Sequence, residues 1–201
     1  CNFPAPVGDN PSLLSFENAI TLFHEFGHAM HGILTDVTYG SMAGTSGPRD
    51  FIELPSQLLE HWVSEPEVLK SFATHYETGE TIPDELIEKL LKAGKFNQGF
   101  INTEYLAASL LDMDWHTMSE FDAQNISNNF EKNSMKKIGL IDEIAPRYRS
   151  TYFAHIFSGG YSSGYYSYVH AAVLDSDAYE AFKEVGNVFD PELSSKLRKE
   201  I

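Results

Sequence analysis

The sequence predicts a mainly α-helical protein. Apolar residues recur at helical spacing in several segments, and proline or glycine residues separate these segments. Little of the chain alternates between apolar and polar residues over enough positions to predict a strand. A hydrophobic share of 42%, with 14 Phe and 10 Tyr in 201 residues, is enough for a sizeable core. We therefore expect residues 1–201 to form a single domain.

The first helix is the best marked. It is expected at about residues 15–33, where Phe23, Phe26, Met30 and Leu34 form one apolar stripe. A glycine-rich loop, YGSMAGTSGPRD, follows it. Capping residues, prolines and glycines set the bounds of the later helices. These are expected at about residues 50–63, 81–91, 95–119 and 128–138, with a short one after Pro66, one from about Gly164, and one that begins at Asp190 and Pro191.

The charge of the chain excludes some partners. The formal net charge is -15, from 29 acidic and 14 basic residues. Binding to phosphate backbones and anionic lipids depends on clustered Lys and Arg, so we expect neither nucleic acid nor a membrane as partner. No apolar run is long enough to span a bilayer. We expect a monomer.

The two ends of the chain suggest a longer protein. The chain lacks an initiator methionine, and its last residues have just begun a helix, so we expect a fragment that is truncated at both ends. The first residues lack the pattern of a signal peptide. The single Cys1 allows no intramolecular disulfide, which favours the cytoplasm.

Residues 22–32, LFHEFGHAMHG, contain the pattern H-E-x-x-H. His24 and His28 lie one turn apart on one face of the expected helix, so both imidazoles can reach one ion, and Glu25 projects beside them. Two neutral imidazoles leave zinc strongly Lewis acidic, and a third ligand plus water completes a tetrahedron. The spacing therefore predicts a catalytic site for one Zn²⁺, with Glu25 within reach of the water.

The third ligand must come from another segment. His31 lies about 10 Å along the helix axis from His24, too far to share an ion with bonds of about 2 Å. The metzincin extension is absent, because it needs glycine at position 31 and histidine at position 34. We choose Glu53, which opens the next helix and reaches the histidines if that helix folds back antiparallel. Gly27 supports this packing, since a mid-helix glycine is easiest to explain where another backbone approaches closely.

These assignments have alternatives in ordinary helix structure. The polar residues of the first helix could face solvent, and Asp50 with Glu53 could form a capping box. Gln57 or Glu60 could hydrogen-bond a ligating imidazole. The other histidines have no companion at ligand spacing, and we expect surface or hydrogen-bonded roles for them: His31, His61, His75, His116 and His170.

A second polar cluster is expected near the C-terminus, in HIFSGGYSSGYYSYVH. Here His155, Tyr161, Tyr165, Tyr166 and Tyr168 surround a Gly/Ser loop. Attack of water on a carbonyl needs donors aimed at the oxygen that becomes negative, and phenol or imidazole groups can donate. The alternative is a packed aromatic cluster, because tyrosine is common at half-buried positions.

The chain contains three stretches that are far more specific together than H-E-x-x-H alone: LFHEFGHAMHG, GTSGPRDFIELPSQLLEHW and YRSTYFAHIFSGGYSSGYYSYVHA. With them the chain resembles the thimet-oligopeptidase-like zinc peptidases, and within that family the bacterial peptidyl-dipeptidases, or dipeptidyl carboxypeptidases. The resemblance covers essentially the whole chain. It implies a zincin-like helical catalytic domain, part of a larger helical ellipsoid with a deep channel for short unstructured peptides.

The resemblance also implies roles for individual residues. The family's zinc ligands match His24, His28 and Glu53, in agreement with the choice made from spacing, and its general base matches Glu25.

Three further residues match the family's transition-state-binding groups, namely His155, Tyr161 and Tyr168. An exopeptidase also needs a cation for the substrate carboxylate, and Arg147 or Arg149 are nearby candidates. Their alternative role is that of a surface arginine paired with an acid.

The predicted function is zinc-dependent hydrolysis of short peptides with release of C-terminal dipeptides. One alternative is an oligopeptide endopeptidase of the same family. Another is a zinc-binding or peptide-binding module without catalysis. We expect the isolated fragment to be weakly active or inactive, because half of the substrate channel would be missing.

Overall fold

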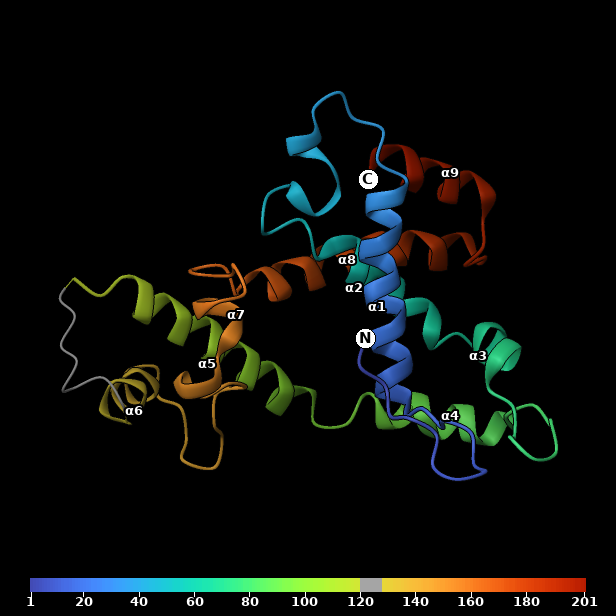
Figure 1. The fold of residues 1–201 in the computed structure, drawn as a ribbon, viewed down its shortest axis with the longest axis horizontal. Coiled ribbons are helices and arrows are strands. Elements are labelled where there is room, and N and C mark those ends of the chain that lie inside the picture. The colour runs from blue at the N-terminus through green and yellow to red at the C-terminus, as the bar shows by residue number, and fades with distance from the viewer. Residues whose placement is uncertain (120–127) are drawn as a thin grey trace. The chain divides into compact units, whose positions relative to one another are not determined.

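The computed structural model describes residues 1–119 and 128–201, and these residues are mainly helical (Figure 1). The longer helices are α1 (Phe16–Ile33), α2 (Leu54–Val63), α3 (Pro66–Phe72), α4 (Asp84–Ala93), α5 (Gln98–His116), α6 (Asn128–Lys137), α8 (Ser167–Val185) and α9 (Pro191–Glu200), and α7 (Ala154–Phe157) is a single turn. Short 3₁₀ turns occupy Gly40–Met42, Gly44–Ser46 and Ser150–Tyr152. The described part of the chain has isolated β-bridges but no strand, so the predicted fold class is confirmed.

Four helices, α2, α4, α5 and α8, begin later than the sequence predicts, because a turn or a bridge comes first. Before α2, the amide of Phe51 donates to the carbonyl of Pro48, and the helix begins only at Leu54. Thr81 lies in a bridge with Thr74 instead of capping α4. The residues from Gly164 form a turn before α8. Backbone hydrogen bonds of these turns and of the bridge satisfy the groups that precede the helices.

Side chains cap two helices whose starts agree with the predictions. The Ser15 side chain accepts from the amide of Asn18, and the Asn18 side chain accepts from the amide of Ser15, which completes a capping box for α1. Asp190 accepts from the amides of Glu192 and Leu193 at the start of α9.

The chain divides into two compact units. Unit 1 contains residues 1–94 and 171–201, and unit 2 contains residues 95–170. Helix α8 begins in unit 2 and continues in unit 1. The expectation of one catalytic domain over residues 1–201 stays a prediction.

In unit 1, the apolar stripe of α1 lines a hollow of about 510 Å³. Phe23, Phe26, Met30 and Leu34 all contribute, together with apolar residues of α2, α8 and α9. His24 and His28 on the same helix do not line this hollow. Among the described residues, no helix combines the length and apolar character that a membrane crossing needs.

In unit 2, the core is strongly aromatic. Ala108 of α5 packs with Phe153, Ile156 and Tyr165, and further tyrosines cover this cluster. A second cluster around Leu111 joins α5 to α6. The segment that contains α7 therefore packs against helix α5.

Candidate metal centre

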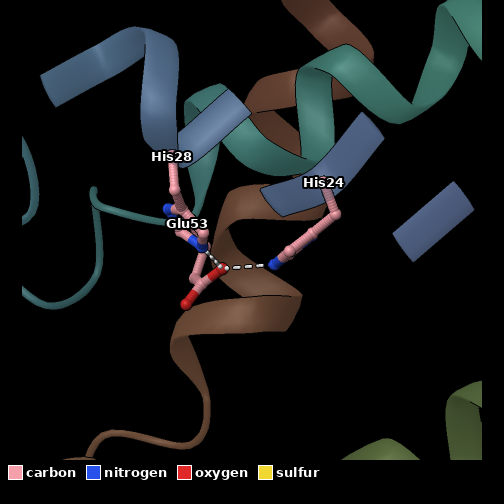
Figure 2. A group of neighbouring side chains, drawn as sticks. All are labelled: His24, His28 and Glu53. Atoms are coloured by element: carbon pink, nitrogen blue, oxygen red, sulfur yellow. Dashed lines mark ion pairs between the residues drawn. The ribbon is translucent and has the colours of Figure 1, made fainter. Parts of the chain in front are cut away.

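Two helices of unit 1 bring His24, His28 and Glu53 together (Figure 2). Both histidines project from α1, and Glu53 is the residue that precedes the first turn of α2. Nε2 of His24 and Nε2 of His28 each lie 3.3 Å from Oε2 of Glu53. The dashed lines in Figure 2 therefore converge on a single carboxylate oxygen.

This geometry fits a tetrahedral metal ion. Zinc bonds of about 2.0–2.1 Å at tetrahedral angles separate neighbouring ligand atoms by about 3.3 Å. The two measured nitrogen–oxygen distances are both 3.3 Å. The three ligand atoms all lie within 4.8 Å of one another, and this is the group among the described residues with the geometry to hold a metal ion. Two imidazoles and one carboxylate also form a donor set that zinc prefers.

Burial makes a cation at this place favourable. Glu53 is only 1% exposed, and a buried carboxylate needs compensating positive charge. The Ser56 hydroxyl donates to Oε2 of Glu53 at 3.0 Å, which holds the carboxylate in position. Glu60, two turns along α2, lies with Oε1 2.6 Å from Nδ1 of His24. Of the two residues expected as possible partners of an imidazole, Glu60 is the one seen at His24, and such a contact orients a ligating imidazole.

The carboxylates also control the charge of His24. Burial lowers the pKa of His24, but the hydrogen bonds and the negative charges of Glu53 and Glu60 outweigh burial and raise the pKa to about 9. The site thus attracts positive charge, either a proton or a metal cation.

Gly27 explains why Glu53 can come so close. Residues in contact run in opposite order along the two helices, since His24 meets Glu60 and His31 packs against Phe51, so α1 and α2 are antiparallel as expected. A Cβ atom on Gly27 would lie 2.5 Å from the carbonyl oxygen of Pro55. The missing side chain lets the backbone of α2 touch α1 one residue before His28.

We predict that Gly27→Ala destabilises unit 1 and weakens metal binding. The added methyl group would overlap the backbone of α2, and such overpacking costs about 1–3 kcal/mol. It would also move Glu53 away from the histidines. The measurements are the free energy of unfolding in urea and the dissociation constant for zinc.

Gly32→Ala is the matched control for this prediction. Gly32 lies on the same helix, and a Cβ atom there would meet nothing within 4 Å. This variant should be stabilised by up to about 1 kcal/mol, because alanine restricts the unfolded chain more than glycine does. Equal stability and equal zinc affinity for the two variants would contradict the close-packing explanation.

The remaining residues of the predicted zinc site take different places. Glu25 is exposed on α1, between the two histidines in sequence. The alternative capping box of Asp50 with Glu53 is wrong, because Glu53 itself is the N-cap residue of α2 and no side chain caps this helix. His31 packs its ring against Phe51 and does not join the cluster of possible ligands.

The second predicted group comes together inside unit 2. The ring centroids of His155 and Tyr161 are 6.1 Å apart, those of His155 and Tyr168 are 6.2 Å apart, and Tyr161 stacks on Tyr168 at 5.4 Å. Tyr165 is buried and packs among them, whereas Tyr166 is exposed. The cluster is therefore both packed, as the alternative proposed, and equipped with hydroxyl and imidazole donors.

The two arginine candidates differ in their contacts. Arg149 is paired with Glu131, with 2.5 Å between Nε and Oε1, which is the alternative role considered for it. The guanidinium of Arg147 lies 4.4 Å from the centre of the Tyr105 ring. Burial lowers the pKa of Arg147, but the neighbouring tyrosines outweigh burial and raise it, so this side chain remains a cation.

Two histidines have carboxylate partners that the sequence did not reveal. Nε2 of His61 lies 2.8 Å from Oδ1 of Asp175 in unit 1, and Nδ1 of His116 lies 2.7 Å from Oδ1 of Asp112 in unit 2. These contacts agree with the hydrogen-bonded roles expected for both histidines. An aspartate inside the apolar run LAASLLDMDW is the signal that could have identified Asp112 as a buried carboxylate.

The helical fold and the cluster of two histidines and one glutamate fit a metallopeptidase centre of the H-E-x-x-H class. Comparison with known proteins identifies the family. The model for "Peptidase family M3" matches residues 1–201. The chain belongs to peptidase family M3, whose members are metallopeptidases, and its mainly helical fold is consistent with their catalytic domain.

The similar proteins include dipeptidyl carboxypeptidases and oligopeptidase A. The chain is 44% identical over 189 residues to dipeptidyl carboxypeptidase of Escherichia coli K12 and 46% identical over 189 residues to that of Salmonella typhimurium LT2, in each case 94% of this chain and 28% of the relative. It is 39% identical over 204 residues to oligopeptidase A of Haemophilus influenzae, which covers 100% of this chain and 30% of that protein. The chain thus spans less than a third of the length of these relatives.

Proposed function

We propose that this chain carries the catalytic centre of a zinc-dependent peptidyl-dipeptidase, which hydrolyses short unstructured peptides and releases C-terminal dipeptides. The observation that carries this proposal is the pair of 3.3 Å distances from two imidazole nitrogens to one buried carboxylate oxygen. The similarity to two dipeptidyl carboxypeptidases supports the particular activity. We further propose that the protein acts as a monomer in the cytoplasm.

One zinc ion is the cofactor of this proposal, and His24, His28 and Glu53 would hold it. When bound, zinc supplies Lewis acidity that polarises water and the substrate carbonyl. Glu53 offsets part of the positive charge, and Glu60 holds the His24 ring in place through Nδ1. Two neutral imidazoles and a single carboxylate leave the cation acidic enough for this chemistry.

Glu25 acts as the general base in the proposed reaction. Its position directly after His24 on α1 and its exposure to water support this role. The carboxylate removes a proton from the attacking water and then delivers that proton to the nitrogen of the departing amine. Oxygen bonds to the carbonyl carbon, the carbon–nitrogen bond breaks, and the two products are a carboxylic acid and an amine.

His155, Tyr161 and Tyr168 stabilise the transition state in this proposal. Tyr168, together with Tyr161 or His155, donates a hydrogen bond to the oxygen that becomes negative during attack. The mutual packing of these three rings in unit 2 supports their action as a group. Donors of this kind contribute about 10²–10³ in rate.

A second candidate function is an oligopeptide endopeptidase, and the similarity to oligopeptidase A favours it. The two activities differ in their need for a free substrate carboxylate, for which Arg147 is a candidate partner. Charge-assisted hydrogen bonds to a carboxylate are strong and are lost when the group is amidated.

We predict that amidation of the C-terminus of a short peptide reduces kcat/KM by at least about 10-fold, since a charged hydrogen bond contributes about 1.5–3 kcal/mol. The measurement compares a free and an amidated peptide of the same sequence, with the cleavage position read by mass spectrometry. The protein should be used in the form that its gene encodes. Equal cleavage of both peptides, at internal bonds, would favour the endopeptidase instead.

A further inference from the structure

Asp112 of α5 is a buried carboxylate with an unusual set of partners. It is 0% exposed. Its Oδ1 accepts from the backbone amide of Ser163 at 3.0 Å, and its Oδ2 accepts from the backbone amide of Tyr165 at 2.9 Å. Nδ1 of His116, one turn further along α5, lies 2.7 Å from Oδ1. Both oxygens of this side chain are thus engaged within unit 2.

The two amides belong to the segment that leads from His155 to Tyr168. We define residues 158–166 as the tyrosine loop. Within this loop the amide of Tyr161 donates to the carbonyl of His155 at 2.9 Å, and the amide of Gly164 donates to the carbonyl of Tyr161 at 2.8 Å. These backbone hydrogen bonds therefore help to fix the spacing between the rings of His155, Tyr161 and Tyr168.

The tyrosine loop has a backbone that needs support. Ser163 has a φ of 56°, in the left-handed region that residues other than glycine rarely adopt. A strained conformation of this kind persists only when the surrounding structure holds it. The bond from the Ser163 amide to Asp112 is made at this residue, and the next bond from Asp112 is made two residues later.

Packing within unit 2 does not by itself explain why a carboxylate is buried at position 112. The core around it is apolar, and burial of a carboxylate there is unfavourable unless donors satisfy it. Its donors on the loop are main-chain amides, so any residue type at positions 163 and 165 except proline would satisfy them. The carboxylate therefore constrains the backbone conformation of the loop and not the residue types in it.

We infer that Asp112 is a positioning residue, which holds the tyrosine loop so that Tyr161 and Tyr168 present their hydroxyls in the geometry that the transition state needs. This inference rests on the proposed function. His116 lies beside the same group: its Nδ1 is 2.7 Å from Oδ1 of Asp112 and 2.9 Å from the backbone carbonyl oxygen of Asp112, with which it forms a hydrogen bond. Asp112 itself touches neither substrate nor metal in this account.

The test is Asp112→Asn, made in the protein as its gene encodes it. The substitution keeps the size of the side chain, but its amide group faces one of the two loop amides with a donor instead of an acceptor. We expect kcat to fall by about 10–100-fold, part of the loss that follows removal of an oxyanion donor. KM should stay within about threefold, and zinc content should stay the same, because loop geometry matters mainly in the transition state.

Two further readouts separate positioning from general damage. A phosphinic peptide, whose tetrahedral phosphorus mimics the transition state, should bind more weakly to Asp112→Asn by about the same factor as the loss in kcat/KM, whereas a dipeptide product should bind as before. Hydrogen exchange at the amides of Ser163 and Tyr165 should be slow in the unmodified protein and faster in the variant. The exchange of α5 amides near Leu111 should not change.

Asp114→Asn is the matched control. Asp114 lies on the same helix, and its carboxylate accepts from Ser134 at 2.8 Å and from Lys137 at 2.9 Å, away from the tyrosine loop. Its kcat, phosphinate affinity and loop exchange should stay close to those of the unmodified protein.

Unchanged kcat and unchanged loop exchange in Asp112→Asn would overturn the inference. If that variant fails to fold, fast exchange at Ser163 and Tyr165 in the unmodified protein would overturn it just as well, and slow exchange there with a smaller loss of kcat in His116→Leu would support it. An unmodified protein that holds zinc but cleaves no peptide would instead refute the proposed function, while the exchange data would still report on the hold of Asp112 on the loop.

Discussion

Glu25→Gln is expected to lose about 10²–10⁴ in turnover while it still binds one metal ion, because a positioned general base contributes that much to rate. The glutamine side chain has nearly the same size but cannot accept a proton from water at neutral pH. The ligand atoms on His24, His28 and Glu53 are untouched, so metal content and stability should not change. The measurements are kcat for a short peptide and the metal content by elemental analysis.

Glu17→Gln provides the control for this prediction. Glu17 is an exposed glutamate in the first turn of the same helix, two turns before Glu25. Removing its charge should leave turnover unchanged. Turnover of Glu25→Gln close to that of Glu17→Gln would refute the assignment of the base.

Glu53→Gln is expected to lose the metal ion and, with it, activity. The amide oxygen is a much weaker zinc ligand than a carboxylate, and the buried site would lose the negative charge that attracts the cation. The fold should survive, since the glutamine oxygen can still accept from Ser56 and a neutral amide is easier to bury than a charge. Zinc affinity by competition with a chelator and helix content by circular dichroism are the two measurements.

Glu60→Gln gives a graded comparison with this variant. Glu60 contacts the outer nitrogen of His24, and loss of such a partner typically costs about 10–100-fold in metal affinity. Glu53→Gln should lose more than Glu60→Gln. The reverse order would mean that Glu53 is a hydrogen-bond partner of the histidines and not a ligand.

The part of the site that could be predicted from the sequence depends on local spacing. His24 and His28 share a face because they are four residues apart on a helix, and no tertiary contact is needed to place them. Glu53 could be chosen because a glycine-rich loop makes a return of the chain possible and Gly27 marks the close approach. The grouping of His155, Tyr161 and Tyr168 followed from a family resemblance and from a short loop, and the structure brings their rings together within unit 2.

Long-range contacts account for what the sequence did not reveal. Asp112 meets backbone amides more than 50 positions away, and amides leave no trace in the residue types of a loop. The late start of α2 has a similar origin, because the turn around Pro48 competes with helix formation through backbone hydrogen bonds. His61 and Asp175 join α2 to α8 across most of the chain, a pairing that helical periodicity cannot indicate.

Anomalous X-ray scattering from crystals of the protein grown with zinc, recorded on both sides of the zinc absorption edge, tests the central claim most directly. We predict one strong peak about 2 Å from Nε2 of His24, Nε2 of His28 and Oε2 of Glu53. A peak at any other place, or a Glu53 carboxylate turned away from the two imidazoles in the presence of zinc, would contradict it.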